Sequence, residues 1–138
     1  MKYTVLLLFF AQAILGQMKT IKVEKEKPKG EPVSVIAGIR SDGNAQVCAI
    51  KRLEKNKHMK VTNTSDDLRI TSFLVSFMSK GKVVEFECNS DSLSNELIAE
   101  LGTLNLAGKP KIFIENVKAV DQAGKKVFLP CIQFKLTN

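Results

Sequence analysis

Few side chains in this sequence have the type and spacing needed for catalysis. The single histidine, His58, lies between Lys57 and Met59, in a stretch whose alternation directs Met59 inward and His58 toward solvent. Nucleophilic catalysis needs a base within hydrogen-bonding distance of the nucleophile. The sequence has no GxSxG, HExxH or glycine-rich phosphate loop. A lone histidine does not make a zinc site without further ligands. We therefore expect no catalytic residue, no metal site and no cofactor.

Two pairs of carboxylates are the remaining candidates for chemistry. Asp66 and Asp67 adjoin in a predicted turn, and Glu85 and Glu87 share one face of a predicted strand. Such pairs serve as acid and base in glycoside hydrolysis or as oxygen ligands for calcium. Outward glutamates on a strand also serve solubility alone, and we favour that interpretation. The triplet at residues 63–65 (Asn-Thr-Ser) fits an N-glycan acceptor, and otherwise forms a polar turn.

The basic residues allow two interpretations, a solvated strand face, which we favour, and a surface for an acidic partner. Lysine and arginine number 21 against 14 acidic residues, a formal net charge of +7. One basic cluster occupies residues 19–29, and a second comprises Lys51, Arg52, Lys55, Lys57 and Lys60. Such clusters suit an anionic membrane face, a polyanion or an acidic protein. The favoured interpretation is a solvated strand face on which lysines alternate with apolar residues. No aromatic residues for base stacking are interleaved with these charges, which disfavours nucleic-acid binding.

Three cysteines leave at least one thiol unpaired within the chain. They are Cys48, Cys88 and Cys131, and no CxxC pair suggests a redox or zinc motif. Cys88 shares a strand face with Val84 and Phe86, whereas the alternation around Cys131 directs it outward. The favoured disulfide, if one forms, is therefore Cys48–Cys88. We favour the interpretation that all three remain thiols.

The first residues have the composition of a secretion signal. A short basic start, Met1-Lys2, precedes an apolar run that ends near Leu15, too short to span a bilayer ~30 Å thick. Cleavage before Ile14 fits the small-residue rule best, and cleavage before Gln17 leaves a start that adjoins the first strand. We take residues 1–16 as the signal peptide and 17–138 as one exported domain, periplasmic or extracellular, with no transmembrane segment after cleavage.

The rest of the chain alternates in the pattern of short strands. Period-two alternation or apolar runs predict strands at residues 19–25, 33–39, 45–50, 59–62, 69–78, 83–88, 111–120, 125–129 and 132–136. Asp42-Gly43 and Gly81 predict hairpin turns. Residues 51–57 are polar, and a helix is expected near residues 93–101, ending at Gly102. The order predicts an all-β fold, an antiparallel β-sandwich with one short helix.

Residues 70–136 resemble the C-terminal domain of GldM, a gliding-motility and type IX secretion protein. The matching stretches are 70–76 (ITSFLVS), 81–86 (GKVVEF), 93–98 (LSNELI), 112–119 (IFIENVKA) and 124–135 (GKKVFLPCIQFK). The resemblance implies an Ig-like β-sandwich in an envelope compartment, which serves in protein–protein assembly and carries no catalytic residues. GldM is a long protein with a transmembrane helix and several stacked domains. A single domain behind a leader therefore favours a stand-alone binding module.

Two functions follow from these patterns. The first is a non-catalytic extracytoplasmic module for protein–protein binding or assembly, linked to an envelope secretion or gliding system. The second is a small secreted hydrolase or enzyme inhibitor that acts through basic loops. In both, the contact surface for an acidic partner is the second basic cluster.

Overall fold

The computed structural model describes residues 31–138, so the predicted signal peptide and the predicted strand 19–25 lie outside the described residues. The strands are β1 (Val33–Ile36), β2 (Ile39–Arg40), β3 (Val47–Ala49), β4 (Met59–Thr62), β5 (Arg69–Ser79), β6 (Lys82–Cys88), β7 (Lys111–Val120), β8 (Lys126–Leu129) and β9 (Ile132–Thr137). The helices are α1 (Ile50–Lys55), α2 (Asn95–Gly102) and the 3-10 turn η2 (Leu106–Gly108).

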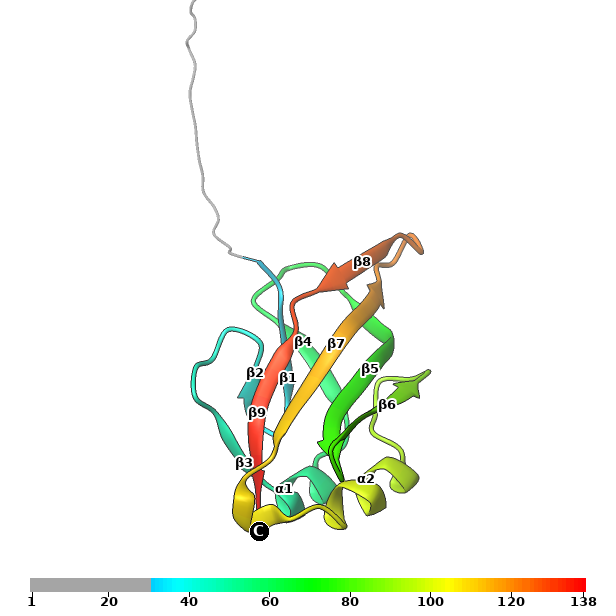
Figure 1. The fold of residues 1–138 in the computed structure, drawn as a ribbon. Helices are drawn as coiled ribbons and strands as arrows, with labels where there is room; N and C mark the ends of the chain where they lie inside the picture. The colour runs from blue at the N-terminus through cyan, green and yellow to red at the C-terminus, as the bar shows by residue number, and fades with distance from the viewer. Residues whose placement is uncertain (1–30) are drawn as a thin grey trace, which may run out of the picture. The chain divides into compact units, whose positions relative to one another are not determined.

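The strands form two sheets packed as a sandwich, as the sequence predicts (Figure 1). The small sheet has the order β2-β1-β4, and the large sheet the order β3-β9-β7-β5-β6, with β8 also paired to β7. All of these pairs are antiparallel except β3–β9, which is parallel. The core lies between the sheets and above α1 and α2, so most of the predicted inward residues meet there.

The long central strands β5 and β7 form the centre of the large sheet because their alternation leaves one wholly apolar face. Phe73, Val75 and Phe77 of β5 and Ile112 and Ile114 of β7 are all buried. Val75 pairs with Ile114 and Phe77 with Ile112, so these side chains stack directly across the ladder. The predicted inward face of residues 69–78 is therefore confirmed.

A bulge in the middle of β7 allows two strands to share one of its edges. Asn116 has a φ of 50°, and the pairing of β5 with β7 shifts register between Ser72 and Leu74. Asparagine tolerates this left-handed conformation better than most residues. On the other edge of β7, β9 pairs as far as Ile114 and β8 begins at Val117. Pro130, which has no N–H for a ladder, lies in the gap between β8 and β9.

The predicted hairpin at Asp42-Gly43 is wrong. The tight turn is at Ala37-Gly38, whose φ angles of 51° and 81° join β1 to β2 in a two-residue hairpin. Asp42-Gly43 does form a turn, in which the Gly43 N–H donates to the Arg40 carbonyl. The chain then leaves the small sheet, and β3 joins the large sheet beside β9 instead of returning beside β1.

Residues 51–57, predicted as a polar connection, contain a second helix. α1 has a single buried side chain, Leu53, which is fully excluded from solvent. The predicted helix near residues 93–101 is present as α2, where the Ser94 Oγ accepts a hydrogen bond from the Leu97 N–H. Only two residues of this short helix, Ile50 and Leu53, pack against the core, and this is too little periodicity for sequence reasoning to detect a helix.

A part-buried hydrogen bond joins β1 of the small sheet to the connection between β8 and β9. Ser34 on β1 is fully buried, and its Oγ donates to the Pro130 carbonyl at 3.1 Å. We expect Ser34→Ala to lower the free energy of unfolding by about 1 kcal/mol, because it removes the hydrogen bond between the buried Ser34 side chain and the Pro130 carbonyl. Urea unfolding measures the loss. The same substitution at half-buried Ser72 is the matched control, and an equal loss at both sites would contradict this role.

Candidate binding surface

The second basic cluster divides into two parts in the structure. Arg52 and Lys55 on α1 and Lys60 on β4 line one groove of about 510 Å³, together with His58. Lys57 turns away from it and donates from Nζ to the Asn95 Oδ1. Lys51 is exposed and does not line the groove. The predicted cluster therefore contains the three lysine and arginine residues that line the groove, and also Lys51 and Lys57, which do not line it.

The floor of the groove is the β1–β2 hairpin. Val35, Ala37 and Gly38 line it, and Val35 lies directly opposite Lys60 in the β1–β4 ladder. The same ladder pairs Ile36 with Met59, and both of these side chains are buried. Strand alternation therefore places Lys60 on the outer face of the small sheet, over the floor of the groove.

Contacts at the C-terminal end of α1 hold this helix in place at the groove. Asn56 closes the helix, and its backbone N–H and its Nδ2 both hydrogen-bond to the Arg52 carbonyl at 3.0 Å. Arg52 also reaches back with Nη2 to the Val47 carbonyl at 3.4 Å. These contacts, with the buried Leu53, fix α1 so that Arg52 and Lys55 face the groove.

The groove concentrates positive charge. Residues 51–60 hold five basic side chains and one acidic side chain, Glu54, whereas the other described residues hold ten basic and eleven acidic. Within residues 31–138 the close contacts between a basic and an acidic side chain are Arg40–Asp42 and His58–Asp91, and neither uses Arg52, Lys55 or Lys60. The unneutralised cations of the groove therefore give this face a positive potential.

His58 lies at the rim, exposed as the sequence predicts. Its side chain is 70% exposed, and its Nδ1 lies 3.4 Å from the Asp91 Oδ1. The backbone beside it is well held, because His58 forms a bridge with Ser92, and Met59 donates its N–H to the Asp91 carbonyl. The ring adds a positive charge to the groove only when it is protonated.

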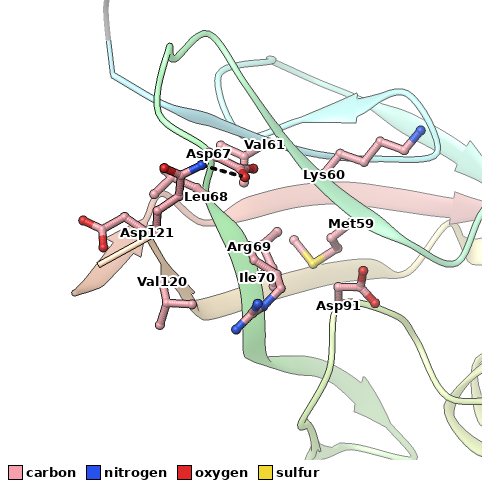
Figure 2. A pocket seen from close by; sticks show the side chains of 11 residues that line it. Met59, Lys60, Val61, Asp67, Leu68, Arg69, Ile70, Asp91, Val120 and Asp121 are labelled. Atoms are coloured by element: carbon pink, nitrogen blue, oxygen red, sulfur yellow. Dashed lines mark hydrogen bonds between the residues drawn. The ribbon is translucent and has the colours of Figure 1, made fainter. Parts of the chain in front are cut away.

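A second hollow, of about 480 Å³, lies between β4, β5 and the end of β7 (Figure 2). Both basic and acidic side chains line it: the basic ones are Lys60 and Arg69, and the acidic ones are Asp67, Asp91 and Asp121. Figure 2 shows Asp91 at one end and Asp67 and Asp121 at the other. The Asp67 Oδ2 accepts a hydrogen bond from Gln122 Nε2 at 3.4 Å. The lining residues come from well-separated segments, so no local sequence signal could have grouped them.

The predicted carboxylate pairs do not form a metal site in the described part of the chain. Glu85 and Glu87 are exposed on β6, as are Asp66 and Asp67 in their turn. Among residues 31–138, no group of three or more histidine, cysteine or acidic side chains is arranged to hold a metal ion. The asparagine of the 63–65 triplet is exposed in the connection between β4 and β5.

The favoured disulfide, Cys48–Cys88, is wrong in this structure, where both residues are free thiols. Cys48 lies on β3 and Cys88 on β6, the two edges of the large sheet, with three strands between them. At ~4.8 Å per strand the edges lie ~19 Å apart along the sheet. A disulfide needs Cα atoms within ~7 Å. Cys88 is buried and Cys131 exposed, as strand alternation predicts.

Thiol labelling distinguishes the three cysteines. We expect iodoacetamide to modify Cys131 in the folded protein and to reach Cys48 and Cys88 only after unfolding. Burial keeps the pKa of both buried thiols above its usual value, which also lowers their thiolate fraction. Mass spectrometry of peptides labelled before and after denaturation measures the difference. Equal labelling of all three in the folded protein would contradict the burial described here.

The comparisons with known proteins give no family to which this chain can be assigned. No model of a known protein family matches the sequence, and no curated protein matches it. Within residues 31–138, none of the helices has the length and apolar character needed to cross a membrane.

Proposed function

We propose that the protein is a non-catalytic, exported module for protein–protein binding, which holds an acidic partner on the groove between α1 and the small sheet. The observation that carries this proposal is the convergence of Arg52, Lys55 and Lys60 on one groove without a carboxylate partner in the described residues. The signal-like first residues support export. The resemblance to the GldM C-terminal domain supports assembly in an envelope secretion or gliding system.

The shape of the groove suits an extended acidic segment. Its floor combines the apolar Val35 and Ala37 with the small Gly38, and its cations come from two elements, α1 and β4. A peptide that carries several carboxylates can therefore meet cations from both elements. Because exposed charge pairs contribute little individually, at most about 1 kcal/mol each, binding requires several pairs and weakens as salt increases.

Charge reversal tests the groove directly. We expect Lys55→Glu with Lys60→Glu to reduce binding of a fluorescein-labelled deca-glutamate peptide by about tenfold or more, because two attractive charges become repulsive. Fluorescence anisotropy at low and at physiological salt measures the affinity and its salt dependence.

The matched control is Lys125→Glu with Lys126→Glu, which changes the net charge equally but lies at the β7–β8 turn. Equal losses in both double variants would mean that net charge alone attracts the peptide. That result, or unchanged binding in the groove variant at low salt, would contradict the groove as the binding surface. Thermal unfolding of each variant confirms that the fold is retained.

A further inference from the structure

The edge strand β6 is an incomplete part of the sandwich. Among the described residues it pairs with β5 on one side and with no strand on the other. Its inward side chains Val84 and Phe86 pack against the core but stay half-buried, and the Phe86 ring stacks on Phe77 with centroids 6.2 Å apart. The neighbouring Val83 is 66% exposed. This edge therefore leaves apolar surface uncovered beside the core.

The backbone of β6 has hydrogen-bonding groups along the edge that faces away from β5. The β5–β6 turn at Lys80-Gly81 has φ angles of 52° and 78°, which define a two-residue hairpin closed by Ser79 and Lys82. Hydrogen-bonded and non-hydrogen-bonded pairs alternate from that closing pair. Val83, Glu85 and Glu87 consequently direct their N–H and C=O groups away from β5. Open edges of this kind are templates for strand addition.

The side chains of β6 define what can pair with it. A second β6 in antiparallel pairing centred on Glu85 would place that glutamate directly opposite its own copy, and like charges opposite each other are destabilising. The fitting strand instead has apolar side chains opposite Val84 and Phe86 and a cation opposite Glu85. Its apolar residues must be two positions apart, with the cation between them.

Residues 20–24 of this chain have that pattern. They read Thr-Ile-Lys-Val-Glu, and their alternation predicts a strand with Ile21 and Val23 on one face. In an antiparallel register, Ile21 lies opposite Phe86, Lys22 opposite Glu85 and Val23 opposite Val84. Glu24 then lies opposite Val83, so residues 20–24 form no like-charged pair in this register. The next residue, Lys25, lies opposite Lys82 at the hairpin end of β6, where the added strand ends. The parallel alternative with Lys22 opposite Glu85 places Glu24 opposite Glu87.

We propose that residues 20–24 of a second copy of this chain add to β6 as an antiparallel edge strand. In this register the donor segment runs from Glu87 toward Val83, at the hairpin end of β6 near α2. The described chain enters β1 at the other end of the domain, beside β8 (Figure 1). The seven residues 25–31 span at most ~25 Å. A second copy supplies the strand without having to return along the domain.

Amide hydrogen exchange and molar mass test whether a strand of one copy adds to β6 of another. In the mature protein we expect a molar mass above that of the monomer and slow exchange of the Val83, Glu85 and Glu87 amides by NMR. Ile21→Asp should shift the mass toward the monomer and speed exchange of these amides by at least about tenfold. Gln17→Asp, which adds the same charge outside the ladder, should leave both measurements unchanged.

A charge swap tests the register. Lys22→Glu alone should weaken association, because it places two glutamates opposite each other, and adding Glu85→Lys should restore it. A monomeric unmodified protein would overturn the proposal. So would amide exchange and molar mass that do not respond to Ile21→Asp. Circular dichroism of each variant separates loss of association from loss of fold.

Discussion

Leu53→Ala is expected to lower the free energy of unfolding by about 2–5 kcal/mol, because it removes a fully buried side chain and leaves a cavity. Leu53 is the only fully buried residue of α1 and its main anchor to the core, beside the partly buried Ile50. Loss of this anchor frees the helix that carries Arg52 and Lys55. We expect a weaker affinity for the acidic peptide as well as lower stability.

Urea unfolding of Leu53→Ala measures the stability, and peptide anisotropy under folding conditions measures the affinity. Leu74→Ala is the matched control, because Leu74 is half-buried on β5 outside the main core. We expect it to cost less than about 1.5 kcal/mol and to leave peptide binding unchanged. If both variants lost the same stability, Leu53 would not be the anchor described here.

Phe77→Ala is expected to have the largest effect on stability, about 3–5 kcal/mol. Phe77 is buried in the middle of the core and stacks on Phe86 of β6. Its removal creates a cavity and also takes away the inward support of the edge strand. We therefore expect the amides of β6 to exchange faster in this variant than those of β7.

Phe128→Ala gives the matched control, since Phe128 on β8 is 68% exposed. The same atoms are deleted, but from solvent instead of from the core, and the expected change is within about 0.5 kcal/mol. Thermal and urea unfolding compare the two variants. A comparable loss at Phe128 would show that β8 packs against something outside the described residues.

The sequence predicted the elements whose signals are local. The β5–β6 hairpin has a glycine turn between two alternating runs, and α2 has a serine cap, an apolar face and a following glycine. The bulged β7 was found as one strand because its apolar centre is continuous. These features depend on residues close together in sequence, which is why pattern reasoning finds them.

The errors arose where distant residues decide the structure. Asp42-Gly43 has a strong hairpin signal, but Ala37-Gly38 closes the hairpin, and Gln46 bonds to the Arg40 backbone and to the Gln133 carbonyl. These bonds help to carry β3 into the other sheet. For the candidate surface, charge alone identified the basic cluster. Only the fold shows that Arg52, Lys55 and Lys60 share a groove and that Lys57 does not.

The parallel pairing of β3 with β9 has a consequence for how the domain folds. Val47 pairs with Lys135, so nearly the whole domain lies between the two partners. Closing so long a loop is entropically costly, and contacts of this kind form late and slow folding. Until β9 is in place, β3 has no ladder partner in its sheet, and α1, which follows β3 directly, lacks a fixed start. A folding chain would therefore form its hairpins before it forms its basic groove.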